Sequence, residues 1–548
     1  MATRVGVHDF DSQLPSMAIE DIERRREFWE QVLVRLEAID RESLSEQDQI
    51  NYDMFERQVS DRVSLYEYGD YLIPITAESG FHTSFARQPA GLPLATTTDY
   101  ENFIARMEAY PLYSEQKIAL MREGMRTGMV LPQVVLDGYE TTITPHLVDD
   151  IIESVFWVPF ENFPTTVPQS DHQGLRQAGR ITIRESVVPA YQAFFDFMVR
   201  DYIPGARATI GASELPNGKD YYEFLVRHHT TLDVTPEQVH EIGLREVERI
   251  RGEMMAIIEG LKSEGEFEGD FDDFLEFLRT DPRFFPTSGE QLLEEASFIS
   301  KKMDGKLPAL FKTLPRQPYG VAPVPAHIAP KYTAGRYSGA PIDGTKAGFY
   351  WVNTYGLESR PLWALTALTL HEAVPGHHLQ NALRQELTDL PNFRRYSGIN
   401  AYGEGWGLYS EWLGIEAGMY DDPYDDFGRL SYEAWRACRL VVDTGLHAMG
   451  WSRQQAMDYM IANTALSLHE ITTETDRYIS WPGQALAYKM GQIKIQELRR
   501  RAESRLGSKF DVREFHDVIL LDGPVPLTVL EDQIEAFIER SGGGPPVS

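Results

Sequence analysis

The chain has 548 residues, of which 42% are hydrophobic and 25% charged, and its formal net charge is -31. This composition is typical of a soluble globular protein. The excess of acidic residues disfavours binding to nucleic acids and to anionic membranes, because both attract basic surfaces. No segment approaches the ~20 apolar residues of a membrane-spanning helix.

Cysteine usage indicates the compartment. Cys438 is the only cysteine, so no disulfide can form within the chain. A chain without disulfides suits a reducing compartment. Residues 1–9 also lack the apolar core of a signal peptide. We therefore expect a cytoplasmic protein.

Helical periodicity dominates the chain and predicts a mainly α-helical fold. Apolar residues recur at spacings of three and four in four segments, residues 17–63, 99–125, 131–155 and 181–202. Another helix is predicted to begin at Thr235, a suitable N-cap residue. Pro236 suits its first position and Gln238 completes a capping box, and the pattern continues to about Leu261.

Prolines cluster between Pro315 and Pro330. Because proline interrupts regular structure, this cluster predicts a boundary between a helical N-terminal lobe, residues 1–314, and a catalytic region, residues 315–548. We expect the two to interleave in one compact unit. The aromatic and β-branched run from Gly348 to Thr354 then predicts a strand of a small β-sheet.

The predicted strand lies shortly before the most reactive segment of the chain. An extended peptide can add to a sheet edge through main-chain hydrogen bonds. We therefore expect Tyr350 and Asn353 to contact a peptide substrate. A buried strand of a small sheet is the alternative interpretation.

Residues 368–380 place one glutamate and three histidines in an apolar segment, Leu-Thr-Leu-His-Glu-Ala-Val-Pro-Gly-His-His-Leu-Gln. In the HExxH pattern, two histidines one helical turn apart hold zinc, and the adjacent glutamate is the general base. His371 and Glu372 match the first half of this pattern. His377 and His378 follow His371 by six and seven positions, so a regular helix would not let either share one ion with it.

Pro375 offers a way to bring the histidines together. In a regular helix its nitrogen would face the carbonyl of His371, but proline has no N–H and its ring clashes there. We expect residues 373–375 to bulge outward and His377 to become the second metal ligand. His378 is the alternative ligand, or a group that supports the site or contacts substrate. A buried histidine cluster without metal is the remaining interpretation.

A catalytic zinc commonly has three protein ligands. We expect Glu404 to be the third, because it follows His377 at a separation that lets a second helix return to the site. Glycines at positions 403, 405 and 407 favour a close approach of the two helices. Glu411 lies seven positions after Glu404, on nearly the same helix face. It would orient a ligand histidine or be the ligand itself.

Peptide hydrolysis also needs a donor that stabilises the oxyanion of the intermediate. Tyr488 and His447 are the candidates. Arg477 or Lys489 is expected to pair with a substrate carboxylate. For these residues, ordinary salt bridges and charge ladders are the alternative interpretations.

Three motifs carry a family resemblance, His371 to His378, Gly403 to Glu411 and Tyr478 to Lys489. In this order they resemble the bacterial family known as domain of unknown function 885, and the resemblance spans nearly the whole chain.

More remotely, the motifs are similar to those of gluzincin peptidases. The segment around Glu404, Gly-Glu-Gly-Trp, resembles the Asn-Glu-Gly-Phe segment of the aminopeptidase N family, whose glutamate binds zinc. The Gly-His pair ending at His377 resembles the end of the zinc motif in the angiotensin-converting-enzyme and thimet-oligopeptidase groups. The departure is two extra residues after Glu372, where dipeptidyl peptidase III has one. The resemblance implies a largely helical, two-lobed fold with a deep cleft.

These observations predict a zinc-dependent peptidase of short peptides with Glu372 as general base. His371, His377 and Glu404 would hold one zinc ion, or another divalent ion, per chain. One alternative is a non-catalytic peptide-binding protein with a degenerate, metal-free site. The other is a metal-dependent hydrolase of non-peptide amides or esters.

Overall fold

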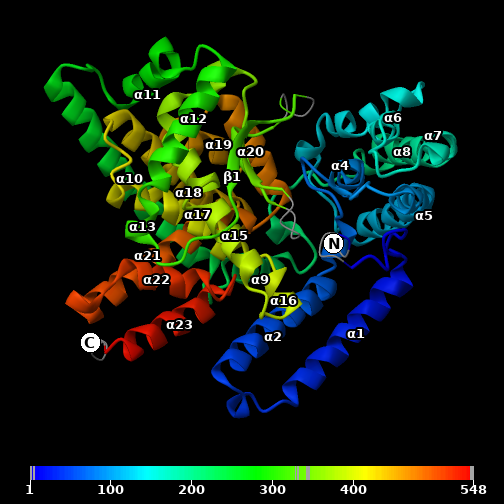
Figure 1. The fold of residues 1–548 in the computed structure, drawn as a ribbon, viewed down its shortest axis with the longest axis horizontal. Coiled ribbons are helices and arrows are strands. Elements are labelled where there is room, and N and C mark those ends of the chain that lie inside the picture. Colours follow the sequence, from blue (N-terminus) through cyan, green and yellow to red (C-terminus); the bar gives the residue numbers. More distant parts are fainter. Residues whose placement is uncertain (1–2, 4–6, 327–328, 330–331, 341–345, 543–548) are drawn as a thin grey trace. The chain divides into compact units, whose positions relative to one another are not determined.

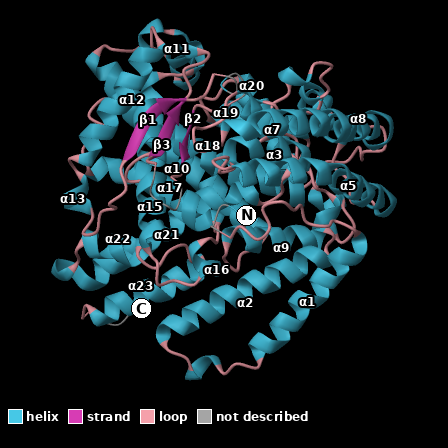
Figure 2. Cartoon of the chain, turned by 45° about the vertical axis from the view of Figure 1, so that its right-hand side comes forward, coloured by secondary structure: helices cyan, strands magenta, loops and turns pink. Residues whose placement is uncertain are grey.

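The computed structural model describes residue 3 and residues 7–326, 329, 332–340 and 346–542. Within these residues the fold is mainly α-helical with one three-stranded β-sheet, as predicted (Figure 1, Figure 2). None of the described helices combines the length and the apolar character that crossing a bilayer requires.

The chain forms two compact units. The first contains Met1–Ser45, Phe55–Tyr221 and Thr473–Trp481, and the second contains Glu46–Met54, Tyr222–Thr472 and Pro482–Ser548. The division expected between residues 314 and 315 falls inside the second unit and stays a prediction. The proline-rich segment after it is no linker between the two units, because part of it forms a strand of the β-sheet.

The first unit is built around α5 (Thr97–Thr127), which packs against α7 and α8. Thr96 caps α5, since its hydroxyl accepts a hydrogen bond from the Asp99 amide at 3.2 Å and the Asp99 carboxylate accepts one from the Thr96 amide at 2.8 Å. The other α-helices of this unit are α1 (Ile19–Glu37), most of α2 (Glu46–Glu67), α3 (Phe81–Ala86), α4 (Gln88–Gly91), α6 (Val158–Glu161), α7 (Gln169–Thr182), α8 (Val188–Phe197), and parts of α9 (Gly218–Thr230) and α20 (Leu468–Ser480).

The prediction of a helix over residues 131–155 is wrong. Most of this segment consists of short 3-10 turns, at Gln133–Leu136, Tyr139–Thr142, Thr144–His146 and Ile151–Glu153. Pro132 and Pro145 cannot donate a backbone hydrogen bond, and Gly138 adopts a φ of 70°. The apolar spacing therefore reflects the burial of successive turns, not one helix face.

The second unit carries the sheet and most of the long helices. The helix predicted to begin after Thr235 is confirmed as α10 (Pro236–Glu264), whose capping box joins Thr235 and Gln238. The other elements are α11 (Phe271–Thr280), α12 (Gly289–Asp304), α13 (Leu307–Leu310), β1 (Tyr319–Pro323), β2 (Gly335–Ser338), β3 (Gly348–Val352), α14 (Leu365–Glu372), α15 (His377–Glu386), α16 (Asn392–Arg395), α17 (Asn400–Glu416), α18 (Pro423–Ala448), α19 (Arg453–Asn463), α21 (Ala487–Leu506), α22 (Val512–Leu520) and α23 (Leu527–Arg540).

The predicted strand is confirmed as β3, the central strand of the sheet. β1 pairs with it in parallel and β2 in antiparallel orientation. Both edges of β3 are therefore occupied, and a substrate backbone cannot pair with this strand. Tyr350 is fully buried against α14. The Asn353 side-chain amide donates to the carbonyls of Ala329 and Tyr332, at 2.9 and 3.0 Å. The two residues expected to contact substrate thus stabilise the sheet and its connections.

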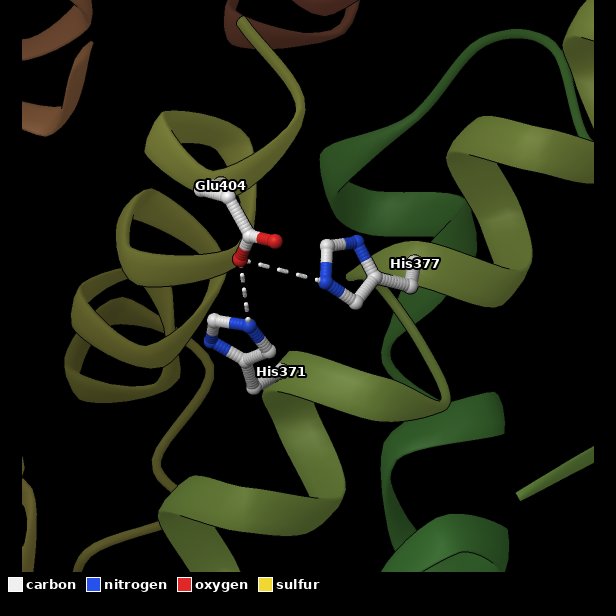
Figure 3. A group of neighbouring side chains, drawn as sticks. All are labelled: His371, His377 and Glu404. Carbon is white, nitrogen blue, oxygen red and sulfur yellow. Dashed lines mark ion pairs between the residues drawn. The ribbon is translucent and has the colours of Figure 1, made fainter. Parts of the chain in front are cut away.

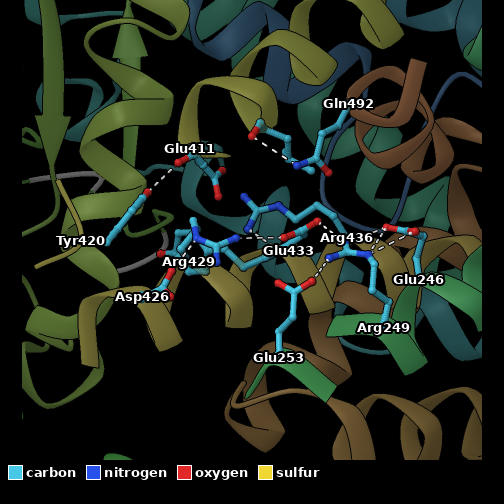
Figure 4. A network of polar contacts seen from close by, with 12 residues as sticks. Glu246, Arg249, Glu253, Glu411, Tyr420, Asp426, Arg429, Glu433, Arg436 and Gln492 are labelled. Atoms are coloured by element: carbon cyan, nitrogen blue, oxygen red, sulfur yellow. Dashed lines mark hydrogen bonds and ion pairs between the residues drawn. The ribbon is translucent and has the colours of Figure 1, made fainter. Parts of the chain in front are cut away.

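A buried network of charges joins α10, α18 and α21 (Figure 4). The Lys489 ammonium lies 2.6 Å from the Glu433 carboxylate and 3.0 Å from that of Glu246. Glu433 also accepts hydrogen bonds from Arg249 at 2.6 Å and from Arg429 at 3.2 Å. Burial raises the pKa of Glu433, but the cations outweigh burial and lower this pKa to about 2. The network therefore holds three helices together through charges that must stay paired.

Replacing Glu433 tests this network. Glu433→Gln leaves Lys489 buried beside fewer negative charges, so we expect the free energy of unfolding at pH 7 to fall by about 3–5 kcal/mol. Because the folded state holds the Glu433 pKa below the ordinary value of 4.5, the wild type loses this stability as the pH falls from about 4.5 towards 2. The difference between the two proteins should shrink over that range in urea titrations.

A matched control is Glu253→Gln, which removes a half-exposed partner of Arg249 from the same network. It should cost at most about 1 kcal/mol. Equal losses for the two variants would contradict the central place of Glu433.

Candidate metal centre

A break in the chain separates the first two histidines of the motif. α14 ends at Glu372 and α15 begins at His377, with residues 373–376 between them. The carbonyl of Leu370 accepts from the Gly376 amide at 3.0 Å, and the indole of Trp406 donates to the carbonyl of Pro375 at 2.8 Å. The interruption predicted from Pro375 is confirmed, and α17 holds it in place.

The break brings His371 and His377 to Glu404 of α17 (Figure 3). The Glu404 Oε2 atom lies 3.5 Å from Nε2 of His371 and 3.6 Å from Nε2 of His377. One ligand atom from each residue lies within 4.8 Å of the others. The two imidazole rings are perpendicular, with centroids 4.7 Å apart. The structure therefore brings together the three residues predicted as metal ligands.

The donor set fits a zinc ion. Two imidazole nitrogens and one carboxylate are a common set of zinc ligands, with an open fourth position in catalytic sites. Bonds of about 2.0–2.1 Å in a tetrahedron place the donors about 3.3 Å apart. The two distances to Glu404, 3.5 and 3.6 Å, are already close to that value.

Glu411 orients His371. Its Oε1 atom lies 2.7 Å from Nδ1 of His371, which leaves Nε2 directed at Glu404. Of the two roles considered for Glu411, the geometry favours the orienting one, because it lies behind a candidate ligand histidine, where metal sites need a hydrogen-bond acceptor. The Tyr420 hydroxyl donates to the Glu411 carbonyl at 2.8 Å. The chain thus fixes the orientation of the His371 ring from its far side.

Two glycines of α17 exclude a side chain for different reasons. A Cβ atom on Gly407 would lie 2.5 Å from Cε1 of His371, so only glycine admits the ring at this place. Gly405 instead faces α21, where a Cβ atom would lie 2.5 Å from the Cα of Gly491. The close approach expected at the metal centre therefore depends on Gly407, whereas Gly405 serves the packing of two helices.

The electrostatics of the cluster favour a cation. Burial lowers the pKa of His371, but hydrogen bonds with Glu404 and Glu411 outweigh burial and raise this pKa to about 10. Burial raises the pKa of Glu404, but the two histidines outweigh it and hold the pKa well below the ordinary value. The carboxylates thus attract positive charge to the imidazole nitrogens, and a metal ion would compete with a proton for them.

Glu372 lies at the edge of the sheet. Its Oε2 atom accepts a hydrogen bond from the backbone amide of Tyr337 at 2.8 Å. Tyr337 belongs to β2, an edge strand, so this amide points away from β3 and towards the end of α14. The carboxylate of the predicted general base is therefore held beside His371 by the backbone of a strand.

His378, the alternative ligand, faces away from the cluster. Its Nδ1 atom lies 3.2 Å from the Tyr337 hydroxyl, and its ring lies 4.6 Å from the Tyr319 ring. Burial lowers its pKa to about 4. The structure therefore places His378 between α15 and the sheet.

A pocket of about 160 Å³ opens beside the cluster, and His377 and Glu404 form part of its wall. Gln380 and Arg384 of α15 form another part, and Tyr402 and Pro524 contribute apolar surface. A second pocket of about 240 Å³ lies behind α14 and contains none of the cluster residues. The smaller pocket is therefore the cavity that the candidate metal ligands can serve.

Four other predicted residues lie outside the cluster. Lys489 is committed to the buried charge network. Arg477 lies in the first unit, where its guanidinium is 3.1 Å from Glu474. His447 is fully buried, with its ring 5.1 Å from that of Tyr222. Tyr488 is half-buried in the first turn of α21, beneath the guanidinium of Arg439.

Two residues of the pocket wall, Gln380 and Arg384, were not predicted from the sequence. They follow His377 by three and seven positions, so they share its helix face, and this spacing is visible in the sequence. Tyr337, whose contact with Glu372 joins residues 35 positions apart, was not predicted either. No local pattern predicts that contact.

Nearly the whole chain matches one protein family. Residues 1–534 match the model of the bacterial proteins of unknown function called DUF885, and the chain belongs to this family. The family anticipated from the three motifs is thereby confirmed. The likeness to gluzincin peptidases stays a prediction. None of the curated proteins matches the chain.

Two solved structures share the fold. The “putative lipoprotein” of Colwellia psychrerythraea is 30% identical and aligns with a TM-score of 0.90, over 98% of this chain and 95% of that chain. A “putative lipoprotein of unknown function” of Shewanella oneidensis is 18% identical and aligns with a TM-score of 0.74, over 97% of this chain and 96% of that chain. The second likeness concerns the fold alone.

The role of Glu411 is testable through metal affinity. Glu411→Gln keeps a hydrogen-bond acceptor behind His371 but removes the charge, so zinc affinity should fall about 10- to 100-fold. Competition with a chelating dye measures it. Glu416→Gln, on the same helix but paired with Arg499, should keep wild-type affinity. Unchanged affinity in Glu411→Gln would contradict the orienting role.

Proposed function

We propose that this protein is a zinc-dependent peptidase that hydrolyses short peptides. The observation that carries the proposal is the convergence of His371, His377 and Glu404 on one point, with Glu372 adjacent to the first ligand. One zinc ion per chain, or another divalent ion, is the proposed cofactor. When bound, zinc supplies Lewis acidity that lowers the pKa of water and polarises a carbonyl group.

Glu372 is proposed as the general base. Its carboxylate would accept a proton from the attacking water and pass it to the nitrogen of the leaving amine. The hydrogen bond from the Tyr337 amide supports this role, because it fixes the carboxylate without protonating it. A positioned base of this kind typically contributes a factor of about 10²–10⁴ to the rate.

Tyr488 is the proposed donor to the oxyanion. It lies in the first turn of α21, which packs along α17, the helix that carries Glu404. The complete burial of His447 makes it the weaker candidate. A phenolic hydroxyl on a half-buried side chain can reach a ligand without exposing a buried group.

The substrate class is proposed from the pocket. Its volume of about 160 Å³ is below the roughly 300–1,000 Å³ of sites that enclose drug-sized ligands, which favours one or two residues of a short peptide. A cytoplasmic location also stays a proposal. The names of the two similar structures, each a “putative lipoprotein”, do not support it.

Glu372→Gln tests the assignment. The variant should retain about one zinc per chain, because its ligands are intact, while peptide hydrolysis falls about 10²- to 10⁴-fold. Hydrolysis is measured by mass spectrometry of a mixture of short peptides, and zinc by elemental analysis. Glu386→Gln, which removes a carboxylate at the far end of α15 that pairs with Arg316, is the matched control and should remain active.

Full activity in Glu372→Gln would remove Glu372 from the reaction. A wild type that holds zinc but cleaves no peptide would direct attention to non-peptide amides and esters. A wild type that takes up no metal would favour the non-catalytic peptide-binding protein.

A further inference from the structure

Arg384 places a positively charged guanidinium in the pocket wall, and no carboxylate among the described residues pairs with it. The side chain is half-buried, and its guanidinium donates one hydrogen bond, from Nη1 to the carbonyl of Ser397 at 3.3 Å. Within the described part of the chain, no carboxylate forms an ion pair with it. Arg249 and Arg429, by contrast, form ion pairs with carboxylates. An unpaired guanidinium withdrawn from water favours an anion supplied by a ligand.

Gln380 adds an unsatisfied donor to the same wall. The side chain is 8% exposed, and apart from a contact with the Tyr402 side chain its buried amide nitrogen has no hydrogen-bond partner. Buried amides are normally hydrogen-bonded, so we expect this amide to turn towards an acceptor on a ligand that binds in the pocket. Among the described residues of the wall, Glu404 is the only acid, and it faces His371 and His377. The rest of the wall therefore favours an anionic, acceptor-rich ligand.

The spacing along α15 matches the end of a peptide. Gln380 and Arg384 follow His377 by three and seven residues, so all three lie on one face, and Arg384 is about 10 Å along the axis from His377. Each extended peptide residue spans about 3.3–3.6 Å. Because 10 Å corresponds to about three such residues, a carboxylate on Arg384 would lie up to three residues beyond a peptide bond placed at His377 and Glu404.

We propose that Arg384 binds the C-terminal carboxylate of the substrate, with Gln380 donating to a peptide carbonyl, so that the enzyme acts as a carboxypeptidase. The inference rests on the proposed peptidase function. Water adds across one C–N bond near the C-terminus. The hydroxyl joins the carbonyl carbon and the proton goes to the nitrogen, which releases a shortened peptide and a C-terminal fragment of up to three residues. Arg384 binds substrate in this scheme and does not enter the chemistry.

The test compares an N-acetylated tetrapeptide that has a free C-terminal carboxylate with the same peptide as its C-terminal amide. Binding is measured by calorimetry on zinc-loaded Glu372→Gln, which should hold peptide without cleaving it. The acid should bind about 10- to 100-fold more tightly than the amide, as expected for a hydrogen-bonded charge. Adding Arg384→Gln should abolish the preference, and adding Arg384→Lys should restore part of it.

Arg395→Gln is the matched control. Arg395 lies on α16, outside the pocket wall, and donates to the carbonyl of Gln385. The preference for the acid should survive this substitution. Circular dichroism and zinc content check that each variant is folded. If Arg384→Gln does not fold, Arg384→Lys still tests the role of the side chain.

The products of the wild-type enzyme distinguish a failure of the proposed peptidase function from a failure of the proposed carboxylate site at Arg384. Cleavage within three residues of a free C-terminus, lost on amidation, supports the carboxypeptidase. Equal cleavage of acid and amide at internal bonds overturns it and leaves the peptidase function standing. An Arg384-dependent preference in binding, with no cleavage by the zinc-loaded wild type, supports the carboxylate site and overturns the peptidase function. Equal binding of acid and amide overturns the role of Arg384.

Discussion

The arrangement of the candidate metal ligands His371, His377 and Glu404 depends on the interruption between α14 and α15. In an unbroken helix, six residues would turn His377 about 120° away from His371. Pro375 prevents that helix, because it cannot donate to the carbonyl of His371. The chain instead ends one helix at the motif glutamate and starts the next at His377. Two helix ends, not one helix face, present the imidazoles to a common point.

The second requirement is α17, which closes the site from the other side. Glu404 faces both imidazoles, Gly407 makes room for the ring of His371, and Glu411 holds that ring from behind. α17 in turn packs on α21, whose buried Lys489 pairs with carboxylates of α18 and α10. The charges that hold these helices thus lie behind the cluster, and Lys489 serves the scaffold of the site.

Local patterns in the sequence predicted what local chemistry decides. Pro375 predicted the helix interruption, and the seven-residue spacing of Glu404 and Glu411 predicted their shared face. Contacts between distant segments were not predictable in this way. The partners of Lys489 are 56 and 243 positions away, so its burial could not be read from its neighbours. The apolar spacing of residues 131–155 likewise suggested a helix where prolines and a left-handed glycine produce turns.

The central claim is that His377, and not His378, completes a metal site with His371 and Glu404. Elemental analysis of the purified wild type beside His377→Ala and His378→Ala tests it most directly. The geometry predicts about one zinc per chain, lost with His377 and retained with His378, because the latter ring lies between Tyr319 and Tyr337. Zinc lost only with His378, or no zinc in the wild type after zinc is supplied, would contradict the claim.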